Sequence, residues 1–143
     1  MRPTYEVSQD LLNEQDIILR FINHFGGHLT PFKMPIQYKL DFCLGDGSSA
    51  KVFAEVKVRK NNKEKYSTYI ISLSKVMAAK SIKESTGLDT VIIVGWTDCI
   101  GYTNLNNDWP IKVGGRTDRN DWQDIEPLAH IPISEFTVIG AKQ

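Results

Sequence analysis

Two acidic residues and a lysine have the types and the spacing that could hold a divalent cation and activate a water molecule. Asp41 lies in one alternating segment and Glu55 and Lys57 in the next, with thirteen residues between Asp41 and Glu55. A hairpin centred on residue 48 would place the two carboxylates about 4.5–5.5 Å apart at Cβ, where they repel unless a proton or a cation separates them. Mg²⁺ or Mn²⁺ would remove that conflict, with the carbonyl of Val56 as a further oxygen ligand.

Lys57 and Glu14 could complete this site. Lys57 lies two residues past Glu55 and so on the same strand face, where its ammonium could orient a metal-bound water or stabilise charge on a phosphate. Glu14 interrupts the apolar face of a predicted helix, at a position that shares its face with Ile18 and Phe21. An inward-facing carboxylate needs a partner, which could be the metal site or a buried Arg or Tyr.

Hydrophobic periodicity predicts the elements that position these residues. Residues 36–44 and 51–59 alternate between apolar and polar side chains, and the intervening GDGSS has the composition of a turn, so an antiparallel hairpin is expected. Helical spacing and glycine stops predict two helices, and apolar runs predict further strands. The helices are expected at 8–25 and 74–86, and the strands at 28–32, 90–96, 100–103 and 130–138.

Composition indicates an ordinary globular protein and limits the classes of function. The 143 residues predict a single domain over 1–143, with a core at about 8–103 and a loop-rich extension at 104–143. The sequence lacks an apolar signal core and any run of 18 apolar residues, so we expect a cytoplasmic protein without membrane contact. Seventeen basic residues balance seventeen acidic ones, which is unusual for a protein that binds nucleic acid.

Asp41 followed by Glu55-Val56-Lys57 resembles the D...ExK signature of the PD-(D/E)XK nuclease superfamily, and the order of predicted elements over about 8–96 agrees. The resemblance implies an α/β fold with a restriction-endonuclease-like αβββαβ core, a mixed central sheet and flanking helices. It also implies that Asp41, Glu55 and Val56 hold the metal. In resolvase-like and phage-type members a glutamate on the first helix assists the metal, a role that would fall to Glu14. Leu40 replaces the proline that often precedes the aspartate.

Four basic residues are candidates for binding the substrate. Lys75 begins the second helix, where the helix dipole disfavours a cation, so a phosphate or the carboxylate cluster is its expected partner. Arg59 lies on the same strand face as Lys57. Arg116 and Arg119 follow a glycine pair and could form a phosphate-binding turn, although interleaved aspartates could equally pair with them.

The function implied by the resemblance is a Mg²⁺- or Mn²⁺-dependent deoxyribonuclease that hydrolyses phosphodiester bonds. An endonuclease is expected, with structure-specific cleavage as one form of it. By analogy with small nucleases of similar build, we expect a homodimer that binds DNA. The residue pattern leaves RNA open as a substrate. The alternative is a catalytically inactive nucleic-acid-binding or assembly module with the same fold, which the zero net charge favours.

Overall fold

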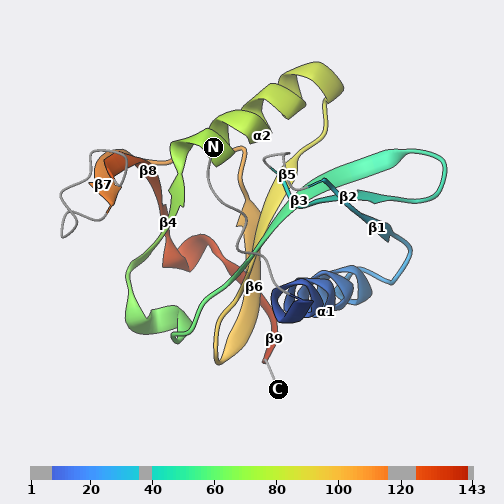
Figure 1. Cartoon of the computed structure of the whole chain (residues 1–143), viewed down its shortest axis with the longest axis horizontal. Coiled ribbons are helices and arrows are strands. Elements are labelled where there is room, and N and C mark those ends of the chain that lie inside the picture. Colours follow the sequence, from blue (N-terminus) through green and yellow to red (C-terminus); the bar gives the residue numbers. More distant parts are fainter. Residues whose placement is uncertain (1–7, 36–39, 116–124, 142–143) are drawn as a thin grey trace.

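The computed structural model describes residues 8–35, 40–115 and 125–141. These residues form two α-helices, two short 3₁₀ helices and nine strands (Figure 1). In chain order the elements are α1 (Ser8–His24), β1 (Thr30–Lys33), β2 (Phe42–Gly45), β3 (Ala50–Val58), η1 (Lys63–Lys65), β4 (Thr68–Ser72), α2 (Leu73–Thr86), β5 (Thr90–Gly95), β6 (Cys99–Asn104), β7 (Ile111–Gly115), β8 (Ile125–Pro132), η3 (Ile133–Glu135) and β9 (Thr137–Ala141).

The central sheet is mixed, and together with α1 and α2 it forms the expected αβββαβ core. Its strand order is β1-β2-β3-β5-β6-β9, in which β3 and β5 run parallel and the other neighbours run antiparallel. The elements α1, β1, β2, β3, α2 and β5 follow one another along the chain, with β4 as an insertion before α2. The expected α/β, restriction-endonuclease-like fold is therefore confirmed.

The hairpin of β2 and β3 has the predicted register. Phe42 pairs with Ala54 and Leu44 with Val52, which centres the hairpin on residue 48, and the register shifts only at Gly45. The turn is closed by the carboxylate of Asp46, which accepts hydrogen bonds from the backbone N–H groups of Ser48 and Ser49 at 3.0 Å each. If this register continues one residue beyond β2, Asp41 lies across from Glu55.

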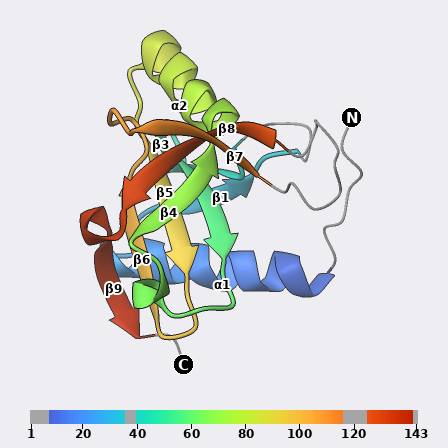
Figure 2. The ribbon, with the colours of Figure 1, turned by 90° about the vertical axis from the view of Figure 1, so that its left-hand side faces the viewer.

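The central sheet separates two apolar cores. Figure 1 shows α1 and α2 on either side of it, and Figure 2 shows β4 and β8 in front of it. One core lies under α1 and comprises Ile17, Ile18, Phe21, Ile22, Phe42, Leu44, Ala54, Val56, Ile93 and Ile100. The other lies under α2 and a second sheet, of order β4-β8-β7, so both faces of the strands in the middle are covered. Burial on both faces explains why β5 reads as a continuous apolar run.

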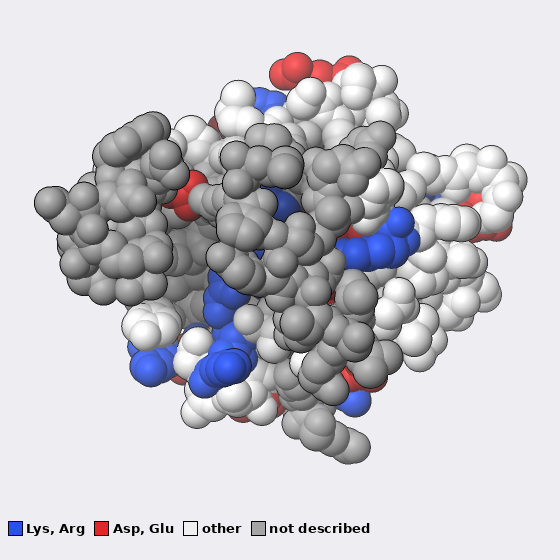
Figure 3. Space-filling view, in the orientation of Figure 1, with Lys and Arg blue, Asp and Glu red and all other residues white. Residues whose placement is uncertain are grey.

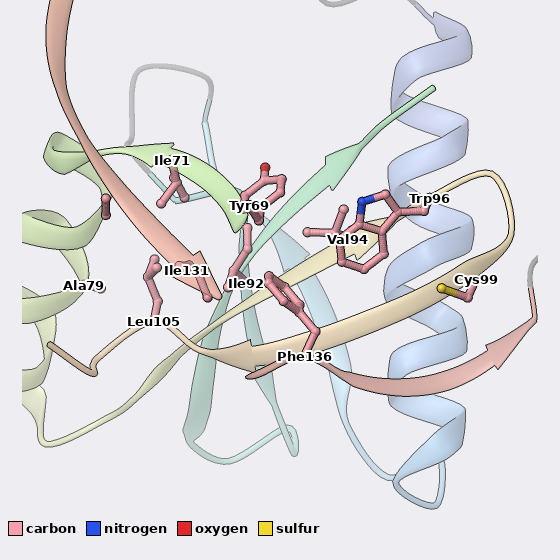
Figure 4. Close-up of a cluster of buried hydrophobic side chains, with 11 residues drawn as sticks. Tyr69, Ile71, Ala79, Ile92, Val94, Trp96, Cys99, Leu105, Ile131 and Phe136 are labelled. Atoms are coloured by element: carbon pink, nitrogen blue, oxygen red, sulfur yellow. The ribbon is translucent and has the colours of Figure 1, made fainter. Parts of the chain in front are cut away.

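Three aromatic rings hold the second sheet against the first. Tyr69 of β4, Trp96 after β5 and Phe136 before β9 lie in one cluster (Figure 4). Their ring centroids are 5.1–6.4 Å apart and their planes cross at 75–89°, the edge-to-face arrangement that aromatic quadrupoles favour. Gly101 packs closely beside them: a Cβ there would lie 3.2 Å from the Trp96 ring, so a side chain at this position would require the ring to shift.

The C-terminal third differs from its predicted structure. Residues 104–143 were expected to be loop-rich with one strand at 130–138, but they contribute β7, β8 and β9. The predicted strand spans the end of β8, a 3₁₀ turn and the beginning of β9, which belong to different sheets. The prediction was wrong because the Gly and Pro residues within these strands interrupt the alternation by which a strand is recognised. Strand β2 is also shorter than the predicted 36–44, of which 36–39 lie outside the described residues.

Removing the Phe136 ring should destabilise the protein strongly. Phe136 is 5% exposed and contacts both other rings of the cluster, so Phe136→Ala should cost about 3–5 kcal/mol of unfolding free energy. Phe32→Ala is the matched control, because that ring is 54% exposed and its loss should cost roughly 0.5 kcal/mol. Urea unfolding of the three proteins measures both differences. Equal losses in the two variants would contradict the role of the cluster.

Candidate active site

Asp41 is held against β3 by a backbone hydrogen bond. Its Oδ2 accepts the N–H of Val56 at 2.9 Å, so the side chain continues the pairing of β2 with β3 one residue before β2 begins. The side chain is 20% exposed. One carboxylate oxygen is therefore fixed by the backbone while the carboxylate still faces accessible space.

Glu55 is buried in the middle of β3. Its side chain has no exposed surface, although its neighbours Ala54 and Val56 already fill the apolar core on the opposite face of the strand. A buried carboxylate needs compensating partners, because burial strongly disfavours its charged form. The sheet face that carries Glu55 is therefore covered and differs from the solvated face of an ordinary amphipathic hairpin.

Two lysines converge on the buried carboxylate. Lys75, in the first turn of α2, lies 3.0 Å from Oε2 of Glu55 and donates a hydrogen bond to Oε1 at 3.2 Å. Lys57 lies 3.6 Å from the same Oε2. Within the described residues both contacts to Oε2 are ion pairs without hydrogen-bond geometry. The first turn of α2 carries no acidic residue, so Glu55 supplies the charge that offsets a lysine at this end of the helix dipole.

Burial dominates the electrostatics of Glu55. Desolvation, together with the negative charge of Asp41, raises the pKa of Glu55 to about 7, although Lys57 and Lys75 oppose the shift. A carboxyl that titrates near neutrality beside a second carboxylate is typical of functional sites. The two lysines are insufficient to keep Glu55 fully ionised near pH 7, so a further cation would stabilise its charged form.

Glu14 reaches the site through Lys33. The ammonium of Lys33, the last residue of β1, lies 3.0 Å from Oε2 of Glu14 and 3.7 Å from Oδ1 of Asp41. Glu14 is 17% exposed, as its place on the inner side of α1 predicts. Lys33 could not be predicted from the sequence, because a lysine between two prolines in a short edge strand carries no signal of the residues that β1 faces.

Arg59 and Tyr69 form the border of the site beyond Lys57. Arg59 donates a hydrogen bond to the Tyr69 hydroxyl at 2.8 Å, and its guanidinium lies 4.9 Å from the centroid of the Tyr69 ring. Burial raises the pKa of Tyr69 well above its usual range, against the opposing charge of Arg59, so the phenol stays protonated. Arg116 and Arg119, the other two arginines expected to bind substrate, lie outside the described residues.

The donor set fits one hard divalent cation. Asp41 and Glu55 are adjacent carboxylates, one fully buried, whose mutual repulsion is visible in the raised pKa of Glu55. In the described part of the chain, no three Asp, Glu, His or Cys side chains gather into a metal-binding group. Two carboxylates, one backbone carbonyl and several waters suit Mg²⁺, which keeps much of its hydration, better than a metal that needs a complete protein cage.

Replacing Glu55 with Gln should reduce the pH sensitivity of the metal-free protein. The pKa of Glu55 is about 7 in the fold against an ordinary 4.5, so its stabilising contribution is complete below about pH 4.5 and disappears as the pH rises through 7. The shift corresponds to ~3 kcal/mol of unfolding free energy.

Urea unfolding in EDTA at about pH 4 and about pH 8 measures this effect. Wild type should lose ~3 kcal/mol more than Glu55→Gln between the two pH values. The contributions of titrating groups that do not interact with Glu55 cancel in that difference. Parallel losses in the two proteins would show that Glu55 titrates as it does in the unfolded chain.

Comparison with known proteins identifies the family. Residues 1–139 match the family described as "Phage putative PDDEXK endonuclease". Among solved structures, the Holliday junction resolvase Hjc of Archaeoglobus fulgidus aligns with a TM-score of 0.48 and 13% identity, covering 85% of this chain and 97% of that one. No curated protein matches the chain. None of the described helices is long and apolar enough to cross a membrane. Because the family match covers nearly the whole chain, which carries the D...ExK residues on an αβββαβ core, the protein belongs to the phage PDDEXK endonuclease family.

Proposed function

We propose that this protein is a Mg²⁺- or Mn²⁺-dependent endonuclease that hydrolyses phosphodiester bonds in DNA. The observation that carries the proposal is the fully buried carboxylate of Glu55, beside Asp41 and in contact with two lysines. An ion pair that only stabilised the sheet would gain nothing from a second carboxylate, which raises the cost of ionising Glu55. Membership of an endonuclease family supports the reaction class.

Asp41, Glu55 and the Val56 carbonyl are the ligands that we assign to the metal. A divalent ion bound there supplies a water of lowered pKa and offsets the charge of the phosphate. Asp41 is suited to this role because its Oδ2 is fixed by the N–H of Val56, which orients the carboxylate toward Glu55. A preoriented ligand loses little side-chain entropy on binding.

The lysines divide into one that faces the substrate and two that position carboxylates. The side chain of Lys57 is 37% exposed and lies beside Glu55, so its ammonium can reach a phosphate oxygen or an attacking water. Lys75 is less exposed and holds Glu55 from the first turn of α2. Lys33 contacts both Glu14 and Asp41. We therefore assign Glu14 an indirect role, in which it acts on the metal ligand Asp41 through Lys33.

We assign substrate binding to the basic residues around this centre. Arg59, the residue after β3, lies two residues beyond Lys57 on the same face of the chain. Arg116 and Arg119 remain candidates for substrate binding on the basis of the sequence. We further propose a homodimer, because a chain of 143 residues offers little surface for recognition and two copies would present two cleavage sites.

Replacing Lys57 with Ala should abolish most cleavage. The variant lacks the ammonium that we assign to orienting the attacking water and to stabilising charge on the phosphate. The rate should therefore fall about 10²- to 10³-fold. The assay uses labelled duplex, single-stranded, flap and four-way-junction DNA and RNA, each with Mg²⁺, Mn²⁺ or EDTA.

Lys51→Ala is the matched control, because Lys51 begins the same strand but pairs with Asp46 at the hairpin turn. It should cleave like wild type. Metal-dependent cleavage at equal rates in Lys57→Ala and wild type would contradict the assigned role. The panel also identifies the substrate and decides between DNA and RNA.

Metal binding should stabilise wild type and leave Asp41→Asn unchanged. A ligand that binds only the folded state at 100 times its Kd adds about 2.7 kcal/mol, which appears as a rise in Tm. Asp89→Asn is the control, since this exposed aspartate pairs with Lys83 outside the site. Thermal unfolding with increasing Mn²⁺ measures all three proteins. An equal rise in the Asp41 variant would place the metal elsewhere, and no rise in wild type would favour the alternative of an inactive binding or assembly module.

A further inference from the structure

A pocket of about 520 Å³ opens beyond the end of β3, beside the candidate active site. Its walls include Arg59, Lys63, Tyr66, Tyr69, Trp96 and His130. Arg59 lines this pocket and lies two residues beyond Lys57 on the same face of the extended chain, so it connects the pocket with the candidate active site. Its volume lies in the range of pockets that enclose a small organic group.

The pocket combines aromatic faces with cations. The Tyr66 ring is 58% exposed at the rim, whereas Tyr69 and Trp96 are 5% and 2% exposed and belong to the walls. Lys63 is a largely buried lysine whose ammonium pairs with Glu64 at 3.3 Å. In Figure 3, Lys and Arg atoms gather at the lower left, over the segment that joins β3 to β4. The ammonium of Lys65 lies 5.4 Å from the centroid of the Tyr66 ring, and an exposed aromatic ring beside a cation favours a ligand that has both a flat π face and a negative charge.

The walls of the pocket are held in place by bonds from both sheets. The N–H of Lys63 donates to Oδ1 of Asp98 at 3.0 Å, and that of Thr97 donates to the carbonyl of Asn61 at 3.1 Å, so the η1 segment is attached to the β5–β6 turn. On the other side, Ile133 donates to the carbonyl of Ser67 at 2.9 Å. A preformed pocket reduces the entropy lost when a ligand binds.

We propose that this pocket binds one unpaired nucleotide of the DNA substrate next to the scissile phosphate. The base would stack on Tyr66, and its phosphate would face Arg59, whose hydrogen bonds to the Tyr69 hydroxyl and to the Val58 carbonyl use two of the five guanidinium N–H donors. In a duplex the faces of the bases are covered by their neighbours, so only an unstacked base can use the Tyr66 ring. The pocket therefore selects DNA that is single-stranded, bulged or flapped near the cleavage position.

This inference rests on the proposed function for its substrate, but its test needs no cleavage. The probe is a DNA duplex with one bulged 2-aminopurine nucleotide, whose fluorescence falls when the base stacks on an aromatic ring. Binding is measured in EDTA by fluorescence and by anisotropy, with the fully paired duplex for comparison. Failure of the proposed function would appear separately, as absence of metal-dependent cleavage.

Tyr66→Ala should weaken binding of the bulged DNA roughly 5- to 100-fold and abolish the quenching, which corresponds to the loss of one stacked base. Tyr66→Phe should retain both, and the fully paired duplex should bind all variants alike. Phe25→Ala is the control, because that ring is 50% exposed at the end of α1. Arg59→Gln should reduce the salt dependence of binding by about one phosphate contact, whereas Lys51→Gln should not.

Two results would overturn the proposal. Bulged DNA that binds Tyr66→Ala as tightly as wild type would show that the base lies elsewhere. Wild type that binds bulged and fully paired DNA equally, or binds neither, would show that the pocket does not select an unpaired nucleotide.

Discussion

The burial of the Glu55 carboxylate is the constraint on which the site depends. A buried charge has to be offset by partners, and here the partners are Lys57 from β3 and Lys75 from α2, whereas Asp41, the residue before β2, carries the same charge as Glu55 and opposes its ionisation. The raised pKa of Glu55 records that the lysines do not fully offset desolvation and Asp41. A divalent cation would complete the balance, which links the stability of this region to its proposed chemistry.

The two-sided burial of the central sheet makes this arrangement possible. Alternation along β3 directs Ala54 and Val56 into the core beneath α1 and Glu55 into the opposite side, which α2 and the second sheet cover. The aromatic cluster of Tyr69, Trp96 and Phe136 then holds the second sheet in position. Tyr69 also hydrogen-bonds Arg59, so the packing that stabilises the fold shapes the border of the site and the wall of the neighbouring pocket.

The zero net charge of the chain does not describe how its charges are distributed. Several acidic residues are paired inside the site, where Glu14 and Asp41 contact Lys33 and Glu55 contacts Lys57 and Lys75. These charges add little to the long-range field, because opposite charges lie within 4 Å of each other. The surface near η1 keeps basic groups beside the pocket (Figure 3). Charge distribution therefore says more about a nucleic-acid partner than the balance over the whole chain does.

The sequence by itself determined the fold class and the hairpin register, and with them the grouping of Asp41, Glu55 and Lys57. Strict alternation and a short turn permit few registers, and a single slip would expose the apolar face of β3. It also indicated that Glu14 and Lys75 needed polar partners. Only the tertiary structure decided which partners they have: Lys33 for Glu14, and Glu55 for Lys75. It alone revealed the second sheet and the pocket at Arg59, because these depend on contacts between segments far apart in the chain, whose pairing no local periodicity encodes.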